Sequence, residues 1–299
     1  MRIGLSVEVK PERASNTAKV IAASTILLES DRRTTSLVSP GAADLCKTLL
    51  SGSVFDRWLA KSSAWPPTRM LWWGLERLTH PGIMKHYWQR KHWIESRVKD
   101  ALAGGFERLV VLGAGFDTLG YRLSESFPQL ELIEFDHPAT QGAKLRTLEN
   151  DLKGIPSNLK FISLDLSRQS FPSEIFDDSK STLFVIEGVL MYLSPDTVDR
   201  LFQALGRLPT RRVRILFSFM TKWPDGRTEF RPRSWLINWW LGWRKEPFAW
   251  GVEPHAMKDF LSARGFVMKE LCSTRELAKG SGLGNTELEG ENLVACEPG

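Results

Sequence analysis

From residue 109 onward, short apolar runs alternate with longer amphipathic stretches, and this alternation constrains the fold more than any other feature. Such a pattern is typical of βαβ units, in which crossover helices join parallel strands. The last two runs follow one another without room for a full crossover helix, which predicts an antiparallel hairpin at one side of the sheet. The sequence therefore predicts an α/β fold with a doubly wound, seven-stranded, mostly parallel sheet. Its strands are expected at 109–112, 130–135, 159–164, 182–186, 213–219, 266–271 and 293–296.

Residues 1–83 lack this alternation and predict an N-terminal helical cap, so that the main domain would span 84–299. Amphipathic patterns predict helices over 17–29 and 42–50. Residues 51–82 are expected to be irregular, as part of a helical cap with loops and not a sheet, because tryptophans are interspersed there with prolines. A long helix is predicted from 84 to 102, where Gly104-Gly105 follows, because glycine is favoured after a helix C-terminus.

Residues 221–251 interrupt the alternation between two predicted strands and contain six tryptophans. Because open α/β sheets build their ligand sites from segments at the carboxyl ends of strands, we interpret this insertion as a substrate lid. Two alternatives stay open. The tryptophans could serve core packing or dimerisation, or the run SWLINWWLGW could attach to a membrane surface, since Arg233, Arg244 and Lys245 flank it.

A glycine turn, Gly113-Ala114-Gly115, separates the first predicted strand from the helix that follows. Its glycines would let the backbone approach a ligand closely, and the helix N-terminus offers unpaired N–H groups. Thr118 stands where a dinucleotide fingerprint has its third glycine, which argues against a pyrophosphate-binding dehydrogenase. The alternative is a tight turn without any ligand.

Acidic residues end the next two predicted strands. Glu134 and Asp136 follow the glycine turn by about 20 residues, the spacing at which an acid meets the ribose hydroxyls of a nucleotide. Strand alternation puts both on one face, so the pattern leaves the choice between them open. Asp165 is placed to accept from an adenine amino group, with the Leu166 N–H facing a ring nitrogen, although a lone Asp after a strand is also a common helix cap.

Four strings in this order resemble the leucine carboxyl methyltransferase family, a branch of the class I S-adenosylmethionine-dependent methyltransferases with a Rossmann-like fold. They are LGAGFDTLGYRL, IEFDHP, the pair DL at 165–166, and IEGVLMYLSP from Ile186. The upstream helix QRKHWIESRVKDAL resembles the family's helix that carries an Arg for the methionine carboxylate. The likeness is good from about residue 84 to 205 and loose outside it. It implies a methyltransferase with S-adenosyl-L-methionine as cofactor.

The resemblance assigns most of the cofactor contacts to the first half of this stretch. Arg90 would pair with the cofactor carboxylate, a use suited to its bidentate guanidinium. The turn Gly113-Ala114-Gly115 would lie under the methionine moiety. Asp136 would hold the ribose.

Further along, the resemblance assigns adenine recognition and the boundary with the substrate. Asp165 and Leu166 would recognise adenine. Glu187, at the end of the fourth predicted strand, would face the cofactor amino group or the substrate. Tyr192 would lie between the cofactor and substrate pockets, with an ordinary half-buried aromatic as the alternative. We expect Glu187 and Tyr192 to take part in catalysis.

The expected reaction is O-methylation of a carboxylate or hydroxyl of a small molecule. A carboxylate needs no base, whereas a hydroxyl would need one, and Tyr192, His137 and His255 are the candidates. The tryptophan-rich insertion does not resemble the family member that methylates the C-terminus of a protein phosphatase, which argues against a protein acceptor. A nicotinamide-dependent oxidoreductase and a non-catalytic, cofactor-binding relative are further alternatives.

The net charge of +5 and pI of about 9.1 are mild for a protein that binds nucleic acid. The arginines at 207, 211, 212 and 214 form the densest basic cluster, without interleaved aromatic residues for stacking on bases. The chain also lacks the Asn/Asp-Pro-Pro-aromatic string of amino methyltransferases that modify bases. Nucleic acid and a membrane surface are therefore less favoured partners than a small-molecule substrate, and the oligomeric state is left open.

The three cysteines form no CxxC or CxxH pair, so we expect neither a disulfide framework nor a metal site. The N-terminus has no apolar stretch of signal-peptide length, and no run approaches the ~20 apolar residues of a membrane span. A cytoplasmic location is expected.

Overall fold

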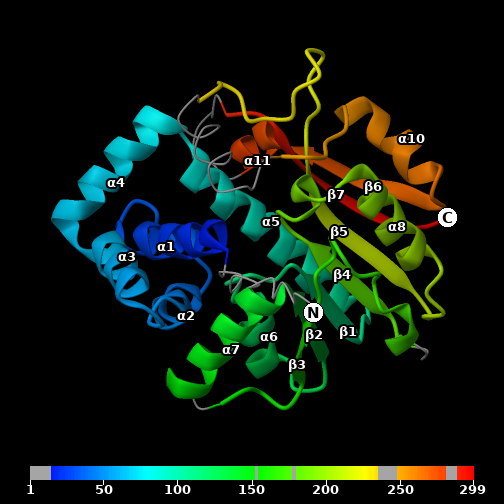
Figure 1. Ribbon diagram of the computed structural model, residues 1–299, viewed down its shortest axis with the longest axis horizontal. Coiled ribbons are helices and arrows are strands. Elements are labelled where there is room, and N and C mark those ends of the chain that lie inside the picture. The colour runs from blue at the N-terminus through cyan, green and yellow to red at the C-terminus, as the bar shows by residue number, and fades with distance from the viewer. Residues whose placement is uncertain (1–14, 152–153, 177–179, 235–247, 281–287) are drawn as a thin grey trace, which may run out of the picture.

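The computed structural model describes residues 15–151, 154–176, 180–234, 248–280 and 288–299 (Figure 1). It contains a seven-stranded sheet in the order β3-β2-β1-β4-β5-β7-β6. Neighbouring strands from β3 to β5 pair in parallel, and β7 pairs antiparallel with both β5 and β6. The predicted α/β sheet is thus confirmed. Its strands are β1 (Arg108–Leu112), β2 (Glu131–Asp136), β3 (Leu159–Ser163), β4 (Thr182–Ile186), β5 (Val213–Met220), β6 (Phe266–Ser273) and β7 (Glu291–Pro298).

Two separate apolar cores lie on the two faces of this sheet, because side chains alternate along each buried strand. Leu109 and Val111 of β1 belong to one core, and Val110 and Leu112 belong to the other. The first core includes residues of α5 (Ile83–Ala103), α6 (Leu119–Ser126) and α7 (Pro138–Asp151), and the second includes residues of α8 (Pro195–Gly206) and α10 (Met257–Ser262). The sheet is therefore doubly wound, with helices on both faces.

The strand order reverses beside β1, since the chain runs from β1 outward to β3 and then returns to β4 on the other side. Ligands of open α/β sheets bind at such a reversal, outside the carboxyl ends of the strands. The predicted hairpin is antiparallel as expected, but the short helix α11 (Thr274–Gly280) lies between its strands in the sequence.

The N-terminal residues form helices that pack beside the sheet (Figure 1). The expectation of irregular structure over 51–82 is wrong. Ser53 caps the start of a helix by accepting a hydrogen bond from the Asp56 N–H, and Pro66 occupies the first turn of the next one. Proline is favoured there because its missing N–H would be unpaired anyway, so these prolines begin a helix instead of interrupting one. The helices are α1 (Asn16–Ser30), α2 (Ala42–Leu49), α3 (Val54–Ala64) and α4 (Pro66–Thr79).

Only the two ends of the tryptophan-rich insertion are described, and Trp235, Trp239, Trp240 and Trp243 lie outside the described residues. The described ends return to the sheet, where Thr221 bridges Val252. Short 3-10 helices complete the fold at η1 (Thr35–Leu37), η2 (Ser173–Ile175), η3 (Leu190–Tyr192) and η4 (Pro254–Ala256). Within the described ranges, no helix is both long and apolar enough to cross a membrane.

Candidate functional site

A cavity of about 1130 Å³ lies at the carboxyl ends of β1, β2 and β4, where the strand order reverses. This volume slightly exceeds the roughly 300–1,000 Å³ of most small-molecule sites, so it offers room for a cofactor and a second molecule. The cofactor and catalytic residues that the resemblance assigns all lie on its wall: Arg90, Gly113, Ala114, Gly115, Asp136, Asp165, Leu166, Glu187 and Tyr192.

The glycine turn forms the floor of the cavity beside β1. Gly113 and Gly115 have φ angles of +67° and +52°, which disfavour other residues. A Cβ on Gly113 would overlap Val189 Cγ2, and one on Gly115 would come within 3.2 Å of Ala18 Cβ on α1. Both positions thus require glycine for backbone conformation and for space.

Asp136 and Glu134, which the sequence left as alternatives, have different surroundings. The Asp136 carboxylate faces the cavity and accepts hydrogen bonds from the backbone N–H of His137, at 2.6 Å, and of Gly115. Burial raises the pKa of Asp136, and these two N–H groups oppose that rise. Glu134 is only 2% exposed, pairs with Lys144 at 2.6 Å and does not line the cavity. Asp136 is exposed to the cavity because it ends the strand.

Asp165 and Leu166 line the cavity in the loop after β3. The Asp165 carboxylate accepts from the Ser167 N–H at 2.9 Å and from its hydroxyl at 2.5 Å. Burial raises the pKa of Asp165, but these hydrogen bonds outweigh burial and leave the pKa below its ordinary value. Asp165 therefore stabilises its own loop and also faces the cavity. The residues that follow it form a turn and not a helix, so it is not a helix cap, and adenine recognition stays a prediction.

A group of buried charges lies beyond the glycine turn, between α5 and the tips of β4 and β7. Arg90, 3% exposed, donates from Nε to Glu187 at 2.8 Å and from Nη1 to Glu291 at 2.9 Å. Its neighbour Lys91 pairs with Asp117 and lies 3.3 Å from Glu187. We call these five residues the ion cluster. With two cations and three carboxylates it has a formal charge of −1, which favours a positively charged ligand.

Glu291, at the start of β7, has the most enclosed carboxylate of this cluster. It accepts from His86 Nε2 at 2.6 Å as well as from Arg90, one helical turn further along α5. Burial opposes its ionisation, but the charge of Arg90 and the hydrogen bond from His86 lower the pKa of Glu291 to about 2. The glutamate thus fixes the face of α5 that bears Arg90 against the sheet.

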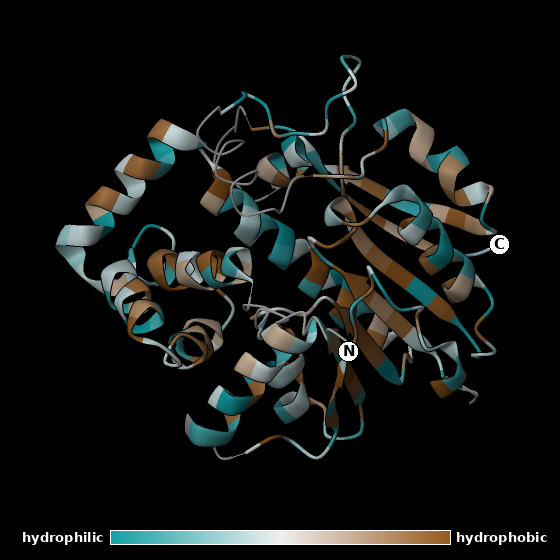
Figure 2. Cartoon of the chain, in the orientation of Figure 1, coloured by the Kyte–Doolittle hydropathy of each residue, from teal (hydrophilic) through white to brown (hydrophobic). Residues whose placement is uncertain are grey.

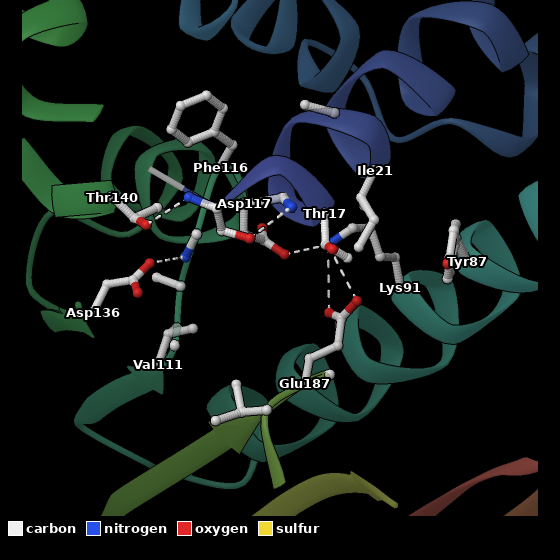
Figure 3. A pocket seen from close by; sticks show the side chains of 18 of the residues that line it. Thr17, Ile21, Tyr87, Lys91, Val111, Phe116, Asp117, Asp136, Thr140 and Glu187 are labelled. Carbon is white, nitrogen blue, oxygen red and sulfur yellow. Dashed lines mark hydrogen bonds and ion pairs between the residues drawn. The ribbon is translucent and has the colours of Figure 1, made fainter. Parts of the chain in front are cut away.

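Figure 3 shows the arrangement of the charged side chains around the cavity. Lys91, Asp117 and Glu187 converge on one side, and Asp136 lies on the other. Burial opposes the ionisation of Asp117, but its contact with Lys91 holds the pKa of this carboxyl well below its usual range. Thr17 and Ile21 reach the same cavity from α1, and Ser15 at the start of this helix donates its N–H to Thr140 Oγ1 at 3.0 Å.

The part of the cavity nearest β4 and β5 is apolar. The Tyr192 ring lies 5.7 Å from that of Phe248, and Phe248 lies 6.1 Å from Phe230. These three rings and Met191 belong to one apolar cluster, which we call the aromatic end. Phe230 and Phe248 come from the two described ends of the insertion that the sequence interpreted as a lid. Its described ends therefore form part of the cavity wall.

A model of the leucine carboxyl methyltransferase family matches residues 22–206 of this sequence, which include most of the cavity wall. This chain belongs to the leucine carboxyl methyltransferase family. The family predicted from the sequence strings is thereby confirmed.

Similar proteins from mycobacteria have names that agree with this family. A Mycolicibacterium gilvum protein, provisionally named an S-adenosyl-L-methionine-dependent methyltransferase, is 35% identical over 132 residues, or 42% of either chain. A Mycobacterium ulcerans protein with the same name is 35% identical over 119 residues, or 38% of either chain. The alignments thus span about two fifths of these relatives. The solved structure of a protein from Thermobifida fusca, provisionally named a methyltransferase, shares the fold, with a TM-score of 0.53 at 16% identity over 85% of this chain and 92% of that one.

Several wall residues of this family member were missed in the sequence interpretation. Glu291 lies about 200 residues after Arg90, and no local pattern links the two. Asp117 follows the glycine turn directly, so its place beside a predicted ligand site was a usable signal. No sequence signal indicated that α1 would contribute to the wall, because an amphipathic pattern does not show which part of the sheet a helix covers.

The two histidines proposed as bases differ in their position. His137 lines the cavity next to Asp136, with its Nε2 3.9 Å from Asp165 Oδ2. His255 does not line the cavity, and its side chain is 81% exposed. His255 is therefore a poor candidate for a base in this cavity.

Proposed function

We propose that this protein is an S-adenosylmethionine-dependent O-methyltransferase that acts on a carboxylate or hydroxyl of a small, largely apolar molecule. The observation behind this proposal is the composition of one continuous cavity. Its glycine-turn end has the polar groups that a nucleoside requires, its middle holds the ion cluster, and its aromatic end offers an apolar surface to a second molecule.

The residues on the wall fit the cofactor. Each Asp136 oxygen accepts one backbone hydrogen bond and keeps lone pairs that ribose hydroxyls can use. The two glycines place no side chain at positions 113 and 115 of the cavity floor. The ion cluster, with its excess of negative charge, suits a sulfonium and an ammonium group. Arg90 contacts two glutamates, so a cofactor carboxylate would have to use the N–H groups that these glutamates leave unoccupied.

When bound, S-adenosylmethionine supplies a methyl group on a positively charged sulfur. The task of the protein is then to hold the acceptor oxygen in line with that methyl group and to exclude water. The rings of Tyr192, Phe230 and Phe248 suit both tasks, because they are rigid and apolar. A carboxylate acceptor needs no proton transfer. For a hydroxyl acceptor, Tyr192 is the wall residue of the aromatic end that could take part in proton transfer.

The cofactor half of the proposal is tested by calorimetric titration with S-adenosylhomocysteine. We expect the intact chain to bind it, and Asp136→Ala to bind it at least tenfold more weakly, a loss of about 1.4 kcal/mol. Asp196→Ala is the matched control, because Asp196 is exposed on α8 and does not line the cavity. Equal binding by the intact chain and Asp136→Ala would overturn the ribose assignment.

The acceptor half is tested with a radiolabelled methyl donor. Apolar carboxylic acids, phenols and alcohols would be compared with RNA, DNA and a peptide that ends in leucine. Label in a small molecule, as a methyl ester or ether, is the expected result. Label in nucleic acid or in the peptide would contradict the proposal, and so would cofactor binding without transfer to any class of acceptor.

A further inference from the structure

The helices α3 and α4 expose an unusual amount of apolar side chain. Of thirteen large hydrophobic residues exposed in the described ranges, eight lie between positions 54 and 78. The most exposed are Leu78, at 82%, and Met70 and Val54, each at 77%. Isolated exposed hydrophobics are ordinary on a protein surface, whereas a cluster of this size marks an interaction site. The eight residues, which we call the cap patch, are Val54, Phe55, Trp58, Trp65, Met70, Leu71, Leu75 and Leu78.

The cap patch lies on two neighbouring helices. At about 100° per residue, Met70, Leu71, Leu75 and Leu78 fall within an arc of roughly 140° on α4. Aromatic contacts join this helix to α3, since the Trp58 ring lies 5.9 Å from Phe55 and 6.4 Å from Trp72 of α4. Figure 1 shows α4 at the edge of the molecule farthest from β6, and Figure 2 shows apolar colour along both helices. The patch therefore faces away from the sheet.

The charges around the cap patch have one sign. The exposed charged residues of α3 and α4 are Arg57, Lys61 and Arg77, all cationic. Both acids of these helices are buried. Asp56 pairs with Lys19 at 2.8 Å, and Glu76 accepts from the Gly82 N–H at 2.7 Å. An apolar face with a purely cationic rim is typical of helices that lie on anionic lipid surfaces.

We propose that the cap patch docks this protein on the surface of an anionic lipid bilayer. The apolar side chains would enter the interface between headgroups and acyl chains, and the three cations would meet the lipid phosphates. The attachment is peripheral, because the 14 residues of α4 span only about 21 Å, less than the ~30 Å hydrocarbon core. A second copy of the chain fits less well. A two-fold interface brings each patch against itself and would place the cationic rims together.

The test is vesicle co-sedimentation of the full chain with two lipid compositions. One vesicle contains phosphatidylcholine alone, and the other contains about one quarter phosphatidylglycerol. We expect binding to the anionic vesicles to be roughly tenfold tighter, and to weaken as salt screens the charges. A blue shift of tryptophan fluorescence should accompany binding, because Trp58 and Trp65 would leave water.

Variants separate the two contributions to binding. Leu71→Gln/Leu78→Gln should weaken binding roughly tenfold by removing apolar surface, and Arg57→Gln/Arg77→Gln should abolish the preference for anionic lipid. The control is Phe127→Gln/Val267→Gln, which changes two exposed apolar residues outside the cap patch and should bind as the parent does. All these positions are exposed, so the variants should fold, which circular dichroism would check.

Two results would overturn the proposal. The first is equal binding of the parent chain and Leu71→Gln/Leu78→Gln to anionic vesicles. The second is a parent chain that does not bind vesicles but forms a dimer, measured by light scattering, together with a Leu71→Gln/Leu78→Gln variant that is monomeric. That outcome would assign the cap patch to self-association. Neither readout uses methyl transfer, so they are independent of the proposed enzymatic activity.

Discussion

The ion cluster and the aromatic end lie in the same cavity, yet their walls are held in different ways. Arg90, Lys91 and their carboxylate partners are fixed by directional hydrogen bonds and charge in a buried setting. Tyr192, Phe230 and Phe248 touch through ring faces and edges, which constrain geometry less strictly. Such a difference suits a site that must bind one fixed cofactor at one end and an acceptor that can differ between relatives at the other.

The largest expected effect comes from breaking the ion cluster. Arg90→Met removes the cation that lies between the buried Glu187 and Glu291 and leaves Glu187 only its longer contact with Lys91, so the free energy of unfolding should fall by about 3–5 kcal/mol. Urea unfolding measures this change. The control is Arg97→Met, because the ion pair of Arg97 with Glu270 is about one third exposed and should contribute roughly 0–1 kcal/mol. Equal losses in the two variants would show that the cluster is no more important for stability than a surface pair.

The pH dependence of this loss provides a second check. The pKa of Glu291 is lowered to about 2 from an ordinary value of 4.5, so its stabilising contribution is complete above pH 4.5 and is lost as the pH falls toward 2. Without Arg90, burial should raise the pKa of this carboxyl. The difference in unfolding free energy between the parent and Arg90→Met should therefore shrink as the pH falls from the raised pKa of the variant, above 4.5, toward 2. A difference that stays constant from pH 7 to pH 3 would contradict the pairing.

The next effect concerns the glycine turn, which follows β1 and lines the cavity. Gly113→Ala combines an unfavourable φ of +67° with an overlap against Val189, so stability should fall by about 2–4 kcal/mol and S-adenosylhomocysteine binding should be lost. Gly41→Ala isolates the backbone cost, because Gly41 has a φ of +76° but open space around it, and should lose only about 1 kcal/mol. If Gly113→Ala/Val189→Ala is no more stable than Gly113→Ala, the overlap is not the cause.

The residues of the cavity wall also indicate what the sequence can predict. The glycine turn follows the buried strand β1 directly, Asp136 ends β2, and Asp165 lies two residues after β3, and each of these strands is recognised from a local apolar run. The resemblance of the string QRKHWIESRVKDAL to a helix of the family then adds Arg90 to the predicted site. Glu291 and Phe230 were not predicted, because their places depend on β5, β7 and the insertion returning to α5 from distant parts of the chain. The helices over 51–82 were missed for a local reason, since the same prolines can end a helix or begin one.

At the aromatic end, a smaller and more selective effect is expected. Phe248→Ala removes a ring that contacts both Tyr192 and Phe230, so the KM for an apolar acceptor should rise roughly tenfold, about 1.4 kcal/mol. The dissociation constant of S-adenosylhomocysteine should stay within about twofold, because the glycine turn and Asp136 are untouched. Phe127→Ala, an exposed position off the cavity, is the control for loss of a ring. Parallel weakening of both ligands would mean that the two ends are not independent.

The smallest effect separates the two acceptor chemistries within the aromatic end. Tyr192→Phe keeps the ring against Phe248 and removes only the hydroxyl. With a carboxylate acceptor kcat should change by less than about twofold, because the nucleophile is already ionised and proton transfer is not needed. With a hydroxyl acceptor kcat should fall by a factor of about 100 if the Tyr192 hydroxyl mediates proton transfer. Steady-state kinetics with one acid and one phenol of similar shape measures both. A large loss with the acid would assign the Tyr192 hydroxyl to acceptor positioning, and no loss with the phenol would remove Tyr192 from the chemical step.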